Sequence, residues 1–196
     1  MGLVDEGQLS IETDDGQAVT IPAGNAYVIL PGHKAKVLGT KHVVLYEFDS
    51  IMSKIVVPHP PAPSDETAFD GVLAVNQEPV VAHNSFESSP LQSSAKDDFA
   101  LTSTLAFESA RIIKTVAKPG FNWNDHIRPI LDNHKSCEHT TCIRRHVGFL
   151  KTGLLHISMD SGQQKTIGPG DSFVIEPGHQ AMVPGSDDMV RHNCNC

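Results

Sequence analysis

The chain contains a long internal repeat. Residues 2–39 align without a gap to residues 148–185 at a constant offset of 146, and 18 of the 38 aligned positions are identical. Unrelated segments of average composition would share only about two or three of them. The identical positions include most of the glycines and the run Pro31-Gly32-His33, which returns as 177–179. The two segments are therefore expected to adopt one structure twice.

Short strands separated by tight turns are predicted within each copy. In the second copy Leu155 and Ile157 alternate with their neighbours until residues 160–162 interrupt the run. Alternation that ends at a glycine predicts a β-hairpin. Residues 168–170 and 177–178 combine proline with glycine and mark two further turns. Turns about every ten residues predict an antiparallel sandwich or barrel.

Two motifs give these turns a family resemblance. Residues 170–179 resemble the second sequence motif of the cupins, G(X)5PXG(X)2H(X)3N, and residues 24–33 resemble it again. The first cupin motif, G(X)5HXH(X)3-4E(X)6G, has a distorted counterpart only between Gly120 and Gly153. The resemblance implies an all-β fold, a cupin-type double-stranded β-helix (jelly-roll) barrel, with an incomplete N-terminal half-barrel.

The resemblance divides the chain into four expected parts. These are a partial cupin repeat comprising the back half only, a Pro/Ser-rich connector, a complete barrel and a tail, at residues 1–57, 58–98, 99–190 and 191–196. A half-barrel alone would expose unpaired strand edges. Either it packs sheet against sheet on the 99–190 unit, or the chain is a truncated product of a longer gene, and both explanations remain open.

Composition excludes some partners. The net charge of -8 leaves no basic patch to neutralise phosphates, so nucleic acid is not an expected partner. No stretch approaches the roughly 20 apolar residues that span a membrane, and the acidic first residues do not resemble a signal peptide. A cytoplasmic protein with reduced cysteines is predicted. Pairing through sheet edges is common in cupins, so the resemblance also implies a homodimer.

The resemblance also directs attention to a set of histidines. Cupins hold a metal through two His and a Glu of the first motif and one His of the second. Matched position by position, His126 falls on the first His, Arg128 on the second His and His146 on the Glu. Ala181 stands at the His of the second motif, but His179, two residues earlier, is expected on the same strand face.

The resulting hypothesis is that His126, His146 and His179 bind one divalent transition metal, with no nucleotide cofactor. Three imidazoles suit Zn, Fe, Ni or Cu. Arg128 would face the same cavity if its segment is extended, and there it could bind a substrate carboxylate. The alternative is that these histidines only make local hydrogen bonds. The recurrence of His33 and His179 in the same turn supports that alternative, because a ring nitrogen can bond nearby backbone.

A second spacing is weaker. Cys137-X4-Cys142 lies near His134, His139 and His146, as in some zinc sites, but the C-X2-C pairs of such sites are missing. A His-rich loop is the favoured interpretation of this segment.

Two classes of function remain open. One is a metal-dependent enzyme, an oxygenase, isomerase or lyase, acting on a small polar molecule within the 99–190 barrel. The other is a non-catalytic small-molecule-binding or structural cupin module without metal, and the fold cannot choose between them. A barrel filled by its own side chains, without a cavity, would favour the second class. Those side chains are Leu155, Ile157, Phe173, Ile175 and Met182.

Overall fold

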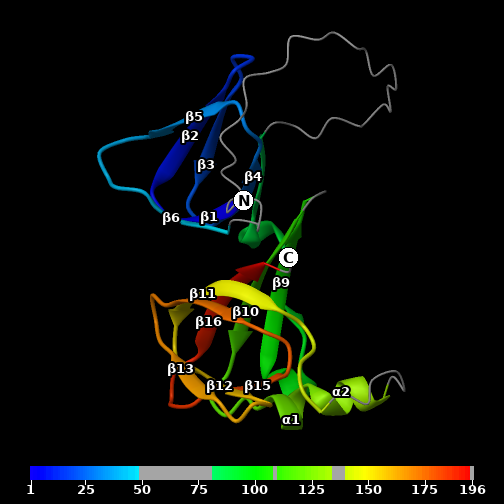
Figure 1. Cartoon of the computed structure of the whole chain (residues 1–196). Helices are drawn as coiled ribbons and strands as arrows, with labels where there is room; N and C mark the ends of the chain where they lie inside the picture. The colour runs from blue at the N-terminus through cyan, green and yellow to red at the C-terminus, as the bar shows by residue number, and fades with distance from the viewer. Residues whose placement is uncertain (49–80, 108–109, 134–139, 195–196) are drawn as a thin grey trace, which may run out of the picture.

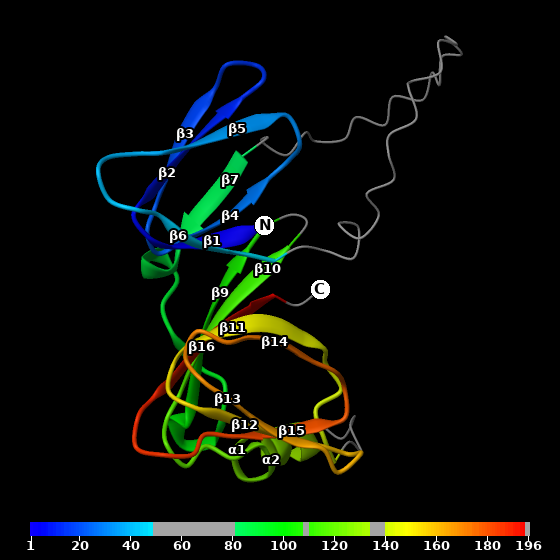
Figure 2. The same cartoon turned by 60° about the vertical axis from the view of Figure 1, so that its left-hand side comes forward.

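The computed structural model describes residues 1–48, 81–107, 110–133 and 140–194. Within these residues the chain forms two stacked β units, the first built mainly from the blue and cyan strands and the second from the green to red strands (Figures 1 and 2). Neither of the two α-helices in the described ranges is long and apolar enough to cross a membrane.

The second unit consists of two facing antiparallel sheets. The larger has the strand order β14-β11-β16-β10-β9-β8 and the smaller the order β13-β12-β15. Their bounds are β8 Gln92–Ser93, β9 Ala100–Ala106, β10 Arg111–Ala117, β11 His146–Thr152, β12 Leu155–Met159, β13 Gln164–Ile167, β14 Ser172–Ile175, β15 His179–Met182 and β16 Met189–Cys194. Alternate residues such as Leu155 and Ile157 are buried between the sheets, which confirms the predicted all-β jelly roll.

The first unit repeats part of this arrangement. It pairs a sheet of order β6-β1-β4-β7 with one of order β3-β2-β5. The bounds are β1 Gly2–Glu6, β2 Gln8–Thr13, β3 Ala18–Pro22, β4 Asn25–Ile29, β5 His33–Val37, β6 Val44–Glu47 and β7 Val81–Ser85. Pairing registers match across the repeat: Leu9 faces Ile21 as Leu155 faces Ile167. The sequence repeat is thus a structural repeat, and the described part of this unit holds no counterpart of β9 or β10.

Two of the expected boundaries need correction. The segment 58–98, expected to be a connector, is described only from residue 81, and there β7 pairs with β4 while β8 pairs with β9. The expected tail 191–196 is part of the barrel up to Cys194, because β16 lies between β10 and β11. Its polar residues suggested a frayed end, but His192 and Asn193 are buried. A further strand expected at residues 53–57 lies outside the described residues.

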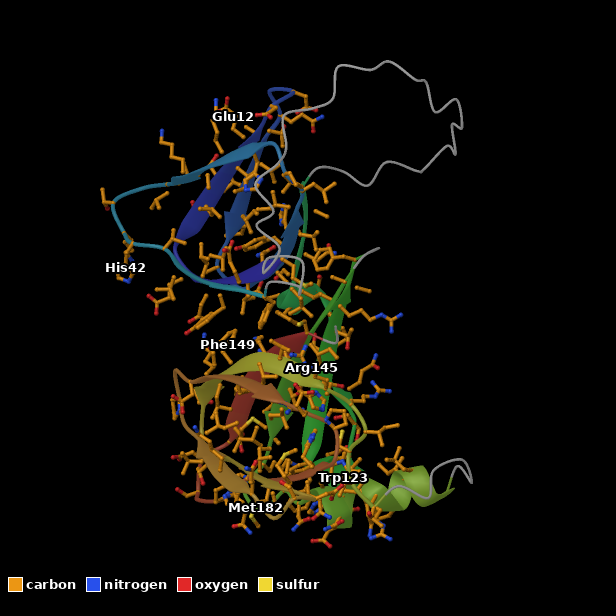
Figure 3. The ribbon with its side chains drawn as sticks, viewed as in Figure 1. Glu12, His42, Trp123, Arg145, Phe149 and Met182 are labelled. Carbon is orange, nitrogen blue, oxygen red and sulfur yellow. The ribbon has the colours of Figure 1, made fainter. Side chains whose placement is uncertain are left out.

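The two units pack sheet against sheet. This is the first of the two explanations offered for the half-barrel. A buried cluster joins Leu3, Ala26 and Phe48 of the first unit to Leu105, Ile112, Phe149 and Cys194 of the second. The ring of Tyr46 stacks on Phe149 at a centroid separation of 3.5 Å, and Asp5 forms an ion pair with Lys151. In Figure 3 Phe149 lies on the face of the barrel that is turned toward the first unit.

Many residues of this interface are repeat mates that lie 146 positions apart. The mates are Leu3 and Phe149, and Asp5 and Lys151. Tyr46 and His192 lie beyond the aligned segments but are also equivalent, because Tyr46 pairs with Leu3 as His192 pairs with Phe149. Equivalent strands thus meet across an approximate two-fold axis, as they would in a dimer of identical subunits. The sequences have diverged at this axis, because Asp5 opposes Lys151 rather than its own kind.

Candidate metal centre

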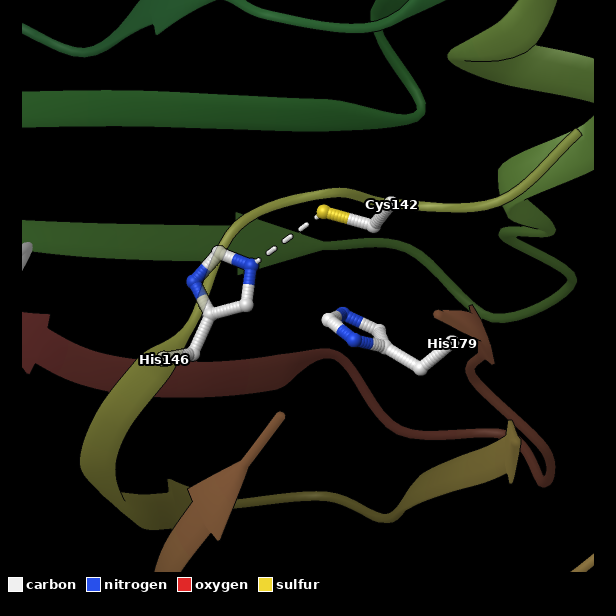
Figure 4. Close-up of side chains that lie close together, drawn as sticks. All are labelled: Cys142, His146 and His179. Carbon is white, nitrogen blue, oxygen red and sulfur yellow. Dashed lines mark hydrogen bonds between the residues drawn. The ribbon is translucent and has the colours of Figure 1, made fainter. Parts of the chain in front are cut away.

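Three side chains from separate segments of the barrel converge. One ligand atom from each of Cys142, His146 and His179 lies within 4.8 Å of the other two, and Cys142 Sγ is 3.5 Å from His146 Nε2 (Figure 4). His146 begins β11 and His179 begins β15. The loop that carries Cys142 is fixed against β15 by backbone bonds, Cys142 N–H to the His179 oxygen and Gly178 N–H to the Cys142 oxygen, both 2.8 Å.

A turn orients the imidazole of His179. Its Nδ1 lies 2.6 Å from the carbonyl oxygen of Glu176, and in the first copy Nδ1 of His33 lies 2.8 Å from that of Leu30. A carbonyl can only accept, so Nδ1 carries the proton and Nε2 keeps its lone pair. The expected turn role of this histidine is thus confirmed in both copies. It is compatible with metal binding, because metal-bound histidines usually donate their other N–H to such an acceptor.

His146 is held in its neutral form. Burial, helped by the charge of Arg191 and by His179, lowers the pKa of His146 to about 3. Burial also lowers the pKa of His179. Both imidazoles are therefore unprotonated bases at neutral pH, which is the form that binds metals. Nδ1 of His146 is buried and has no hydrogen-bond partner among the described residues.

The donor set fits a metal ion. A tetrahedral ion bound to sulfur at about 2.3 Å and nitrogen at about 2.1 Å separates these ligand atoms by about 3.4 to 3.6 Å. The 3.5 Å between Cys142 Sγ and His146 Nε2 falls in this range, and the third ligand atom is close enough to complete the set with a small side-chain movement. One thiol and two imidazoles leave a fourth position for water or substrate, as in catalytic zinc sites.

The structure places the four predicted site residues differently. His146 and His179 come together, but His126 is not part of their group. Its ring stacks on Phe99 at 3.9 Å, and its Nδ1 lies 2.9 Å from the Asn122 carbonyl oxygen. Arg128 does not line the cavity around the group.

The reason is a local helix. Two short helices, α1 Trp123–His126 and α2 Arg128–Asn133, replace the extended segment that placing Arg128 beside His126 required. The Asn122 side chain caps α1 by accepting from the backbone N–H of Asn124 at 2.9 Å. His126 ends α1 and Arg128 begins α2, so the alternation of an extended strand, on which the predicted shared face depended, does not apply to them.

Cys142 joins the two histidines although the ligand set implied by the cupin motifs does not include it. The weaker Cys137-X4-Cys142 spacing does place it near His146, but Cys137, His134 and His139 of that spacing lie outside the described residues. A signal was nonetheless in the motif, where the second His precedes the Glu by four or five residues. Cys142 precedes His146 by four residues. Counting back from His146 would have placed Cys142 in the site.

A cavity of about 400 Å³ adjoins the three side chains. Much of its wall is apolar and includes Phe121, Trp123 and Leu131, while Arg144 and Arg191 add positive charge. Trp123 lies at the end of the barrel away from the first unit (Figure 3). A larger depression of about 830 Å³, near β13 and β14, is lined by neither histidine nor cysteine.

The barrel interior is partly filled by side chains and partly open as a cavity. Four of the five expected filling residues, Leu155, Ile157, Phe173 and Ile175, are buried in the core, but Met182 is 41% exposed. A cavity remains beside them, and Leu155 lines part of it. The packed interior that would have favoured a purely structural module is therefore absent from this end of the barrel.

Comparison with known proteins supports the architecture. No family model and no curated protein matches the sequence. A solved structure from Pseudomonas aeruginosa, described as a glyoxylate-induced protein, superposes with a TM-score of 0.60 at 14% identity. The alignment covers 98% of this chain and 63% of that one, so the chain spans less than two thirds of its length. The chain has the cupin fold.

Two shorter structures are also similar to part of this chain. The cupin domain of a transcriptional regulator from Enterobacter cloacae gives a TM-score of 0.35 at 17% identity, covering 49% of this chain and 94% of that one. KdgF from a Halomonas species gives 0.38 at 15% identity, covering 55% and 86%. At these identities the likeness concerns the cupin fold alone.

Proposed function

We propose that the second cupin unit is a metal-dependent enzyme domain acting on a small molecule bound in the 400 Å³ cavity. One observation carries the proposal: Cys142, His146 and His179 bring three ligand atoms within 4.8 Å of one another beside that cavity. Three protein ligands with a fourth position open is the arrangement of catalytic rather than structural sites.

The ligand types narrow the choice of metal. One thiolate with two imidazoles suits zinc best among the four expected metals, with iron, nickel and copper as the others. When bound, such an ion polarises a substrate oxygen or lowers the pKa of a bound water. Zinc would favour the isomerase and lyase classes, because an oxygenase needs a redox-active metal.

Residues of the chain itself hold the ligand side chains in place and exclude water from the cavity. The carbonyl of Glu176 fixes the ring of His179, and β15 fixes the loop of Cys142 through two backbone bonds. Trp123 and Phe121 cover the cavity with apolar surface. A dry, rigid site strengthens the electrostatic interactions that act on a bound substrate.

Metal content of the purified full chain tests the proposal. We expect about one transition metal per chain by elemental mass spectrometry, falling to trace levels in Cys142→Ser, His146→Gln and His179→Gln. His126→Ala is the matched control and should keep the metal, because its ring stacks on Phe99 outside the group. Retention of the metal in the three ligand variants, or its loss only in the His126 variant, would overturn this site.

A further inference from the structure

The charged side chains that line the cavity are all basic. Its lining includes Arg144, Arg191 and the two histidines of the metal group, but no aspartate and no glutamate. The whole chain carries a net charge of -8, so the lack of acids here does not reflect composition. A cavity with two cationic side chains and no carboxylate has only the Cys142 sulfur as a possible counter-charge in its lining.

Arg191 is the inward-facing cation. It lies on β16 at the centre of the large sheet, where it pairs with Leu150 on one side and Thr115 on the other. Arg191 lines the cavity, whereas the next residue, His192, faces the first unit. The alternation of the strand therefore directs the guanidinium into the barrel.

The guanidinium has spare hydrogen-bonding capacity. Its Nε is shielded from water and has no hydrogen-bond partner within the described parts of the chain. Burial lowers the pKa of Arg191, and the Cys142 sulfur is the group that opposes this shift. A thiolate that binds a metal shares its charge with that metal. Arg191 is then left as a buried cation in need of an anion, which is costly unless a ligand supplies one.

We propose that the ligand of this cavity is a small organic carboxylate, whose carboxylate pairs with Arg191 and whose hydrocarbon part lies against Trp123 and Phe121. The planar guanidinium matches a carboxylate with two parallel N–H···O bonds. A phosphate dianion would call for more donors than this largely apolar wall provides. Exposed Arg144 stands at the edge of the cavity, where it attracts an anion from solution.

This inference rests on the proposed function for its view of the ligand as a substrate, although recognition of the carboxylate by Arg191 does not require the metal. Trp123 is the only tryptophan of the chain and lines the cavity, so its fluorescence reports binding there. The probes are two pairs of equal shape, benzoate with benzamide and hexanoate with hexanamide. Each is titrated into the metal-free and the zinc-loaded full chain.

We expect at least one carboxylate to bind at millimolar concentration or below, and about tenfold to a hundredfold more tightly than its amide. Arg191→Gln should abolish this preference, and Arg191→Lys, which keeps the charge but loses the planar fork, should retain part of it. Arg145→Gln is the matched control, because Arg145 pairs with Glu176 at 3.0 Å and does not line the cavity.

Several results would overturn the inference. One is equal affinity for the carboxylate and its amide, and another is a preference that survives both Arg191 variants. A third is no binding of either carboxylate at a ligand concentration of about 10 mM. Circular dichroism checks that each variant is folded, and the lysine variant keeps the test valid if the glutamine variant is not. Metal content is measured on the same samples. Carboxylate preference without metal would refute the proposed function alone, and metal without carboxylate preference would refute this inference alone.

Discussion

At the scale of single residues, this chain buries several ionisable side chains that have unsatisfied polar atoms among the described residues. His146 and Arg191 belong to the cavity, whereas His192 belongs to the contact between the units. The ring of His192 stacks on Phe149 at 5.1 Å and meets the edge of Phe86 at 5.4 Å. Burial, followed by the charges of Lys114 and Lys151, lowers the pKa of His192 to about 4.

The lowered pKa of His192 predicts acid lability. The unfolded chain binds a proton below the ordinary histidine pKa of about 6.5, but the folded chain does not until about pH 4, so stability is complete above pH 6.5 and is lost as the pH falls. His192 alone should cost about 2 kcal/mol between pH 6.5 and pH 5, at 1.36 kcal/mol per pH unit. Urea unfolding of His192→Phe should show a loss smaller by that amount. The partly exposed His156→Gln should lose as much as the parent chain, and an equal loss in all three would contradict the prediction.

At the scale of elements, the turn between β14 and β15 connects the fold to the site. Gly178 has φ +86°, and an added Cβ would lie 2.9 Å from Asp160 Oδ2. Its repeat mate Gly32 has φ +92° and the same close approach, at 3.0 Å from Asp14. Both turns need glycine, because other residues are strained at positive φ. Only the second turn leads into the candidate metal centre, through His179.

Gly178→Ala and Gly32→Ala therefore form a matched pair. Each should lower the free energy of unfolding by about 1 to 2 kcal/mol through the strained φ. Gly178→Ala should in addition weaken zinc binding by about tenfold or more, because it shifts His179 and its bond to Glu176. Calorimetric titration with zinc measures this, and equal zinc affinity in the two variants would show that the turn does not position the ligand.

The sequence predicted local features better than distant ones. The repeated hairpins follow from alternation around Leu155 and from glycine turns, and both signals lie within a few residues. The grouping of Cys142 with His179 depends instead on a backbone bridge between segments 37 positions apart. Arg191 was assigned to a tail, because the burial of β16 is created by neighbours that local polarity does not reveal.

At the scale of the whole molecule, the contact between the repeats has the form of a dimer interface with unlike halves. Two copies of the first repeat would place Asp5 against Asp5, and two copies of the second would place Lys151 against Lys151. Only the mixed pairing brings opposite charges together, and the Asp5 side chain is only 14% exposed. The divergence of these two positions therefore selects the pairing that the structure shows.

Charge reversal tests this selection. Asp5→Lys and Lys151→Asp should each lower the free energy of unfolding by about 1 kcal/mol, because each opposes like charges at a partly buried site. The double variant should recover most of that loss. If the double variant loses as much unfolding free energy as the two single variants together, the pair contributes no specific attraction.

The covering of the Phe149 face also bears on concentration. In a dimer of separate chains, this apolar surface would be covered only as far as the protein concentration allowed, and the apparent stability would fall on dilution. Here Tyr46 and Phe48 belong to the same polypeptide as Phe149, so the tether keeps their effective concentration high at any dilution. The expected homodimer remains a prediction, and it would have to form through a surface other than this one.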